Sequence, residues 1–324
     1  MSRVRQVITA IIATAFSAAL FTSAAPARAT THDPDGPGQW GLTQVGAPDA
    51  WARTTGAGVR IGIVDTGVDF AHEDLAGKVV AHTSCLGAAG DPARCGGSGE
   101  DDNGHGTHVA GVAAALRGNG RGIAGIAPDA QLVVAKVVTV SGAATVADVV
   151  AGIKWVVDHG ARVVNLSLDD PDMTFAAIDG SAIREGIDYA WTRGAVPVFS
   201  AGSPARLGLG RGLGLGRHSD RDLNAVIAGA TGADGRMSPS SPPTGDARLA
   251  VLAPGGSAGT DPAAAYVSGA IALLLAEGYN GLGAVDRLLE TADGTVHCGE
   301  GSPDCYGRID VAAATSGPVQ QSAR

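Results

Sequence analysis

The chain has 324 residues, which is enough for one large α/β domain or two small ones. Apolar residues make up 45% of it, a normal globular balance, while aromatic residues contribute only 4% and glycine is abundant. The formal net charge of -9 argues against non-specific binding of nucleic acid, which requires a basic face. We therefore expect a globular protein with no nucleic acid among its partners.

The first 29 residues have the pattern of a secretory signal peptide. Two early arginines are followed by an almost unbroken apolar run at 7–25 and by a small-x-small cleavage pattern at 27–29. An uncleaved membrane anchor is the alternative, because the run is just long enough to span a bilayer. The cleavage pattern and the polar residues after it favour removal. We expect a short linker or pro-segment at 30–39 and a mature protein that is secreted, extracellular and not bound to a membrane.

From Trp40 onward, short strand-like runs alternate with helical ones. In chain order the pattern predicts a strand at 59–64, a helix at 107–116, strand 131–138, helix 146–159, strand 163–168, helix 182–192, strands 196–200 and 225–230, and a last clear helix at 263–277. Strands that alternate with helices of ten or more residues predict βαβ units and a mostly parallel sheet covered on both faces. We expect one α/β domain in three α/β/α layers over residues 40–315, followed by a tail at 316–324.

Sites in such sheets form at the carboxyl ends of the strands. Asp65, Asp169 and Ser203 lie at or just past predicted strand ends. These residues are therefore candidates for a common site.

Four cysteines fit an oxidising compartment and allow three pairings. Pairing of near neighbours, Cys85 with Cys95 and Cys298 with Cys305, closes two short polar loops and is favoured. A zinc site is the competing interpretation, but the chain has no C-x-x-C pair.

Residues 207–217 (LGLGRGLGLGR) repeat with a six-residue period. The glycines never satisfy G-x-G-x-x-G, and no strand or helix start flanks them as a dinucleotide site requires. We interpret the repeat as a surface loop.

Three stretches carry a specific resemblance to subtilisin-like serine proteases, the subtilases. Residues 61–69 (IGIVDTGVD) resemble the catalytic-aspartate motif of that family, and residues 103–111 (NGHGTHVAG) match its catalytic-histidine motif throughout. Residues 253–255 (APG) with 259–269 (GTDPAAAYVSG) resemble the catalytic-serine motif in altered form. The resemblance runs from about Trp40 to Ala313 and implies the subtilisin-like three-layer fold and a polypeptide substrate or ligand.

The chemistry of the family explains why these residues recur. Peptide hydrolysis by this route needs a hydroxyl made nucleophilic by an imidazole, which a buried carboxylate holds in one tautomer. The resemblance makes His105 the base and Asp65 the residue that orients it.

Asp261 occupies the nucleophile position. A carboxylate there cannot accept an acyl group and regenerate as a serine does, and together with ionised Asp65 it would hold His105 protonated. Asp261-Pro262 also fits an ordinary helix start, with Asp as N-cap and Pro at the first helical position.

Two further positions depart from the family pattern. Ser203 stands where the family has the asparagine that helps to bind the oxyanion. Ser167, Leu168 and Asp169 lie in the stretch that resembles the lining of the substrate cleft, where the family continues with glycine and this chain continues with Asp169 and Asp170. The loop between Pro254 and Gly259 is also short.

The combined departures predict a pseudoprotease, a monomeric binding or scaffolding module without peptidase chemistry. One alternative is an active serine endopeptidase with an unrecognised nucleophile, for which Ser257 and Ser268 are candidates. Another is a cation site formed by Asp65, His105 and Asp261, a ligand set that suits several divalent metals. A decaying gene product without function is the remaining possibility.

No cofactor is expected. Structural calcium is common in the family, and the acidic residues 100–102 (EDD) offer ligands without a spacing that identifies a site.

Overall fold

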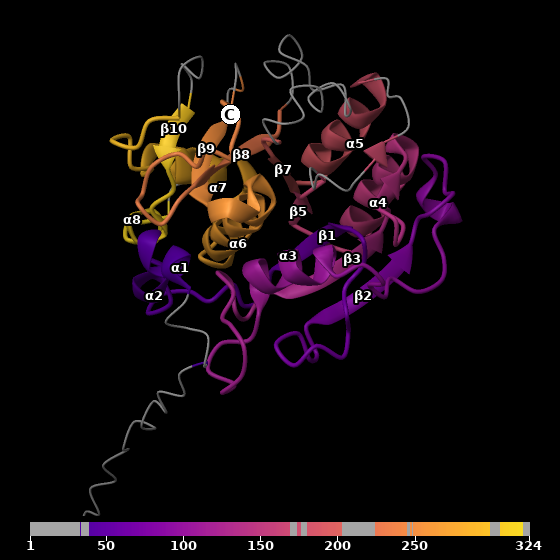
Figure 1. The fold of residues 1–324 in the computed structure, drawn as a ribbon, viewed down its shortest axis with the longest axis horizontal. Coiled ribbons are helices and arrows are strands. Elements are labelled where there is room, and N and C mark those ends of the chain that lie inside the picture. The colour runs from indigo at the N-terminus through magenta and orange to yellow at the C-terminus, as the bar shows by residue number, and fades with distance from the viewer. Residues whose placement is uncertain are drawn as a thin grey trace, which may run out of the picture. The chain divides into compact units, whose positions relative to one another are not determined.

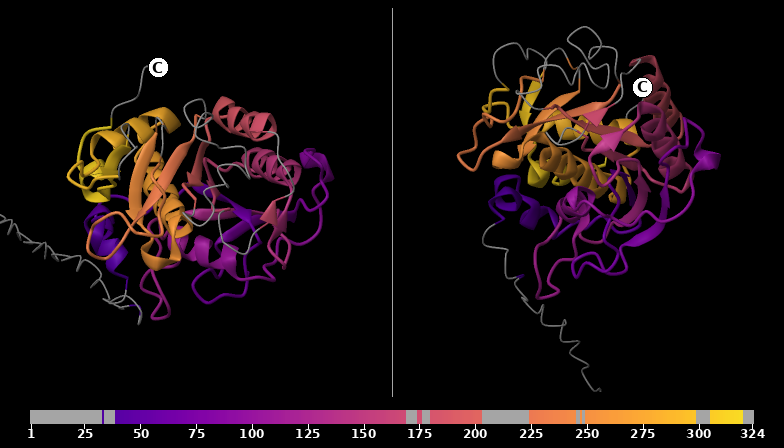
Figure 2. Two further views of the ribbon diagram at one scale, coloured as in Figure 1. Left: turned by 45° about the horizontal axis from the view of Figure 1, so that its top comes forward. Right: turned by 45° about the vertical axis from the view of Figure 1, so that its right-hand side comes forward.

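Eight parallel strands form the central sheet of the computed structural model, which describes residues 33, 39–168, 174–175, 180–202, 224–244, 247, 249–298 and 305–319. Their order across the sheet is β10 (Cys305–Arg308), β9 (Ala250–Pro254), β8 (Val226–Thr231), β7 (Val196–Ser200), β5 (Val163–Leu166), β1 (Arg60–Asp65), β3 (Gln131–Lys136) and β2 (Val79–Ser84). Because all of them run in the same direction, the carboxyl ends of β1, β5 and β7 lie at one edge of the sheet (Figures 1 and 2).

Helices cover the two faces of the sheet, and each face has its own hydrophobic core. One face carries α3 (His105–Ala114), α6 (Thr260–Ala276) and α7 (Gly281–Glu290), and the other carries α4 (Val146–Asp158) and α5 (Gly180–Thr192). Three short helices, α1 (Trp40–Gln44), α2 (Ala47–Ala50) and α8 (Val311–Thr315), complete the first face. Two 3₁₀ turns lie at Pro92–Arg94 and Gly256–Ala258.

Strand β1 packs against helices on both faces of the sheet. Ile61 and Ile63 are buried in the core beneath α3 and α6, and Val64 is buried in the core beneath α4. A Cβ atom at Gly62 would lie 2.7 Å from the side chain of Val156 on α4, so the missing side chain lets the helix approach the strand closely. This alternation is the packing expected for a strand in a parallel sheet.

Each predicted strand and helix is present, and the predicted three-layer α/β/α fold is confirmed. The helix predicted at 263–277 is α6, but the prediction that it is the last clear helix is wrong, because α7 and α8 follow. Glycines at two of the first three positions of α7 disguise its helical pattern in the sequence. Strands β2, β9 and β10 were also missed; β2 has a single buried residue, Thr83, among half-buried and exposed ones, and β10 has only four residues.

A second, two-stranded sheet pairs β4 (Ala143–Ala144) in parallel with β6 (Thr174–Phe175). It joins a segment that follows β3 to one that follows β5. The two segments that leave the carboxyl edge of the main sheet are thereby linked.

Both predicted disulfides are confirmed, Cys85–Cys95 and Cys298–Cys305. With all four cysteines paired, none is available as a zinc ligand.

No single helix within the described ranges is long and apolar enough to cross a membrane. The bent pair of α6 and α7, with 117° between the two helices, meets those criteria together by length and composition alone.

Candidate active site

Asp65 ends β1 at the carboxyl edge of the sheet, and its side chain is completely buried. Its Oδ1 atom accepts a hydrogen bond from the backbone N–H of Thr66 at 2.7 Å and lies 2.8 Å from Nδ1 of His105. The other carboxylate oxygen, Oδ2, is buried without a hydrogen-bond partner. The strand thus presents one carboxylate oxygen to the imidazole.

His105 is the first residue of α3 and lies between two glycines, Gly104 and Gly106. The helix starts after Gly104, whose φ of 101° lies in the left-handed region that favours glycine. A Cβ atom at Gly106 would lie 2.1 Å from the carbonyl oxygen of Gly67 in the loop after β1. The two glycines therefore allow α3 to begin directly against the end of β1.

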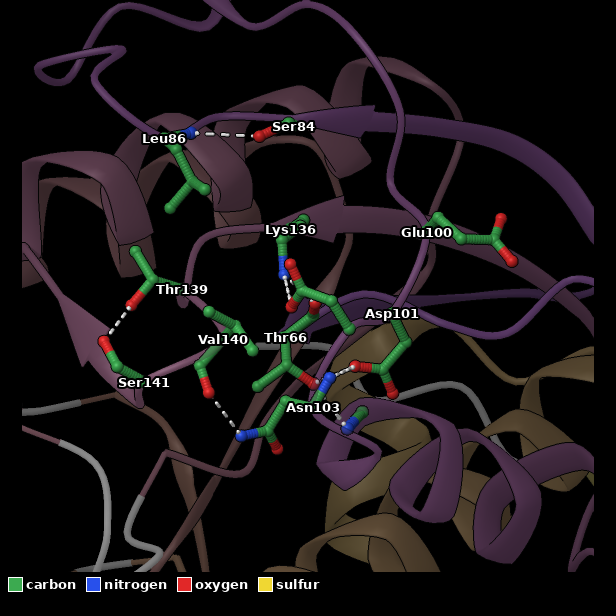
Figure 3. A network of polar contacts seen from close by, with 12 residues as sticks. Thr66, Ser84, Leu86, Glu100, Asp101, Asn103, Lys136, Thr139, Val140 and Ser141 are labelled. Atoms are coloured by element: carbon green, nitrogen blue, oxygen red, sulfur yellow. Dashed lines mark hydrogen bonds and ion pairs between the residues drawn. The ribbon is translucent and has the colours of Figure 1, made fainter.

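Asp101 braces the loop that carries His105 (Figure 3). Its Oδ1 atom accepts hydrogen bonds from the hydroxyl of Thr66 and from the backbone N–H groups of Asn103 and Gly104. Its Oδ2 atom accepts from both the N–H and the hydroxyl of Thr107. Burial raises the pKa of Asp101, but these hydrogen bonds outweigh it and lower the pKa. Sequence analysis missed this role; an Asp just before a helix start was the available signal.

A buried lysine joins this brace to the central sheet. The ammonium group of Lys136, at the end of β3, donates to the carbonyl of Thr66 and to Asp102, the latter at 2.7 Å (Figure 3). The side chain of Asn103 donates to the carbonyl of Val140 at 3.2 Å. The histidine loop is thus tied both to β1 and to the segment that leads to β4.

Asp261 lies in the first turn of α6, and its carboxylate faces His105 from the side opposite Asp65. Its Oδ2 atom is 3.2 Å from Nε2 of His105, while its Oδ1 atom is buried without a partner. The prediction of Asp261 as N-cap and Pro262 as the first helical residue is wrong. The N-cap is Gly259 and the helix begins at Thr260, because the φ of 85° at Gly259 starts the helix two residues earlier.

The three side chains form a continuous row, with the imidazole between the two carboxyl groups. Side-chain exposure is 0% for Asp65, 11% for His105 and 8% for Asp261. Burial alone lowers the pKa of His105, but the charge of Asp65, the hydrogen bonds to both carboxylates and the charge of Asp261 outweigh it and raise the pKa to about 11. Burial also raises the pKa of Asp65, against the lowering effect of His105. The direction of the shift at His105 favours the protonated imidazole, which can donate from both nitrogens. We call Asp65, His105 and Asp261 the ion triad.

Of the other predicted site residues, the structure describes Ser167 and Leu168 but not Asp169 or Ser203. Ser167 and Leu168 follow β5 and are both buried, with Ser167 donating from its hydroxyl to the backbone carbonyl of Asp261 at 2.9 Å. Asp169 and Ser203 lie outside the described residues, as does the repeat at 207–217. The end of β7 still reaches the site, because Gly202 and the hydroxyl of Thr260 exchange two hydrogen bonds of 3.0 Å.

In the described part of the chain, no group of three or more His, Cys, Asp or Glu side chains is arranged to hold a metal ion. In the ion triad, both imidazole nitrogens already contact carboxylates. In the acidic loop at 100–102, two carboxylates already have protein partners. Asp101 accepts five hydrogen bonds, and Asp102 forms an ion pair with Lys136. Neither place offers a free set of carboxylates to a cation.

Comparison with solved structures shows the same fold. A protease from Pseudoalteromonas arctica matches with a TM-score of 0.68 at 23% identity, over 88% of this chain and 98% of that one. Fervidolysin from Fervidobacterium pennivorans, a keratinolytic enzyme related to subtilisin, matches with a TM-score of 0.69 at 25% identity, over 90% of this chain and 47% of that one.

Sequence comparison gives relatives of the same kind. Thermitase from Thermoactinomyces vulgaris is 40% identical over 51% of this chain, and a thermophilic serine proteinase from Bacillus sp. (strain AK1) is 32% identical over 84% of it. These alignments span 54% and 65% of the two relatives, less than two thirds of either. Subtilisin DY from Bacillus licheniformis is 35% identical over 68% of this chain and 78% of its own length.

The sequence profile described as "Subtilase family" matches residues 56–293, a segment that contains all three members of the ion triad. The chain belongs to the subtilase family of subtilisin-like serine proteases.

Proposed function

We propose that this subtilase has lost peptidase chemistry and serves as a binding or scaffolding module for polypeptides. The observation that carries the proposal is the contact between Asp261 and His105 at the position where the family has its serine. A general base must accept a proton from the nucleophile, and an imidazolium between two carboxylates has no free lone pair to do so. Removal of the nucleophile from a Ser-His-Asp triad costs on the order of 10⁶ in turnover.

The alternative of an active endopeptidase needs another nucleophile. Ser268 is an unsuitable candidate, since it is completely buried and its hydroxyl donates to Asn165 at 2.9 Å. Ser257 lies in the 3₁₀ turn before α6 and stays a candidate by position only. Covalent labelling by a serine-reactive phosphonate, mapped to one residue by mass spectrometry, would support this alternative.

We propose the same boundaries as the sequence predicts: a signal peptide at 1–29, a linker at 30–39, a peptidase-fold domain at 40–315 and a tail at 316–324. Two disulfides support a secreted, extracellular location, because such bonds persist in oxidising compartments. We propose a monomer whose partner is a polypeptide.

Subtilases commonly bind structural calcium, but the acidic loop at 100–102 does not fit that ion.

The test is incubation of the purified mature protein with a fluorescently labelled denatured protein, with His105→Ala as the control. We expect neither protein to release fragments and the parent to bind the labelled substrate saturably in an anisotropy titration. Hydrolysis by the parent that His105→Ala abolishes would refute the loss of chemistry. Absence of saturable binding would refute the binding role.

A further inference from the structure

Behind Asp261, three buried side chains form a chain of hydrogen bonds that runs in one direction. The hydroxyl of Ser268 donates to Oδ1 of Asn165 at 2.9 Å, and Nδ2 of Asn165 donates to the hydroxyl of Ser167 at 3.0 Å. The hydroxyl of Ser167 then donates to the backbone carbonyl of Asp261 at 2.9 Å. We call Ser268, Asn165 and Ser167 the relay.

The relay is anchored in rigid parts of the fold. All three residues are 0% exposed. Asn165 lies in β5, where its backbone pairs with Ile63 of β1 on one side and with Val198 of β7 on the other. Ser268 lies two turns into α6 from Asp261, so the relay connects a central strand to both the middle and the first turn of one helix. An amide on a doubly paired strand has little freedom to move, which makes it a fixed reference point.

The carboxylate of Asp261 depends on its backbone for its position. Among the described residues, its side-chain hydrogen bond goes to His105 alone, because Oδ1 has no partner there. The N-cap, Gly259, contributes no side-chain hydrogen bond to the first turn. Within the described ranges, side chains anchor the backbone of this turn through the bond from Ser167 and the contact between Thr260 and Gly202. A small rotation of the turn would move the carboxylate away from the imidazole.

We propose that Asn165, Ser167 and Ser268 are positioning residues that hold the Asp261 carboxylate against His105. This inference rests on the ion triad of the proposed function. It adds that the triad is maintained from the interior of the fold by residues that never touch His105. Loss of a relay bond frees the first turn of α6, lengthens the contact between Oδ2 and Nε2, and weakens the electrostatic support of the imidazolium.

The test uses Ser167→Ala and Ser268→Ala, each of which removes one relay hydroxyl, in the full mature protein. Ser241→Ala is the matched control, because Ser241 is a buried serine that also bonds to backbone but lies outside the relay. For each variant, the pKa of His105 is measured by NMR titration of its imidazole, and the free energy of unfolding by urea. Asp261→Ala gives the pKa of His105 with the second carboxylate absent.

We expect Ser167→Ala to lower the pKa of His105 from about 11 toward the Asp261→Ala value, Ser268→Ala to lower it less, and Ser241→Ala to leave it unchanged. If Ser167→Ala does not fold, Ser268→Ala decides alone. A relay variant that loses stability as the control does but keeps the parental pKa of His105 would overturn the proposal. Because the readout is a pKa, it is separate from the hydrolysis assay, which tests the loss of peptidase chemistry.

Discussion

Oδ2 of Asp261 lies 3.2 Å from Nε2 of His105, the ring nitrogen that faces away from Asp65. In an active subtilase this nitrogen accepts the proton of the serine hydroxyl. In this chain the nitrogen faces a carboxylate instead. The inherited aspartate and histidine are therefore in contact, and in the proposed function the carboxylate at position 261 converts the base into a buried cation.

The pH dependence of stability should report this cation. The folded-state pKa of His105 is raised to about 11, above its unfolded value of 6.5. Its contribution to the free energy of unfolding is therefore fully present below pH 6.5 and is lost as the pH rises toward about 11. Asp261→Asn keeps the shape of the side chain but removes its charge, so the pKa of His105 should be lower. The loss of stability that accompanies deprotonation of His105 should therefore end at a lower pH in this variant. Urea unfolding of both proteins between about pH 6 and pH 10 measures this; identical profiles would contradict it.

Restoring the nucleophile alone should restore little activity. Asp261→Ser supplies a hydroxyl and removes one carboxylate from His105, but Ser203 still stands where the family resemblance predicts the oxyanion asparagine. Because loss of an oxyanion donor costs about 10²–10³ in turnover, Asp261→Ser with Ser203→Asn should exceed Asp261→Ser alone by roughly that factor. Hydrolysis of a peptide anilide measures both, with His105→Ala added to each as the control. Equal rates for the single and double variants would show that Ser203 does not occupy that position.

The start of α3 should tolerate no side chain at its second residue. In Gly106→Ala the new Cβ would lie 2.1 Å from the carbonyl oxygen of Gly67 and 3.1 Å from Cβ of Asp65. Relief of this overlap has to displace the helix from β1, which should lower the free energy of unfolding by about 1–3 kcal/mol. Gly96→Ala is the control, since no heavy atom lies within 4 Å of its Cβ position. Equal unfolding midpoints in urea would refute the tight contact.

Much of the fold and the ion triad could be predicted from the sequence, because both depend on short local patterns. Apolar β-branched runs mark the buried strands, and the motifs at 61–69 and 103–111 place Asp65 and His105 at adjacent ends of β1 and α3. Elements with weak hydrophobic patterns were not predicted, such as the glycine-containing α7 and the half-exposed β2.

The supports of the triad could not be predicted, because their partners are chosen by packing. Ser268 and Asn165 are 103 positions apart, and Ser167 and Asp261 are 94 apart, so no spacing rule connects them. The helix start at Thr260 was misplaced for a related reason. Asp-Pro is a good start by local preference, but the left-handed backbone of Gly259 and the contact of Thr260 with Gly202 place the start earlier.

The most direct test of the account is the protonation state of His105 in the folded protein. A ¹⁵N NMR titration of the imidazole, assigned by comparison with His105→Ala, measures it. We expect both ring nitrogens to carry protons at neutral pH and to keep them until the pH approaches about 11. An imidazole that loses its proton near its ordinary pKa of 6.5 would be a competent base at neutral pH, and would contradict the claim that Asp261 has converted this site into a fixed ion triad.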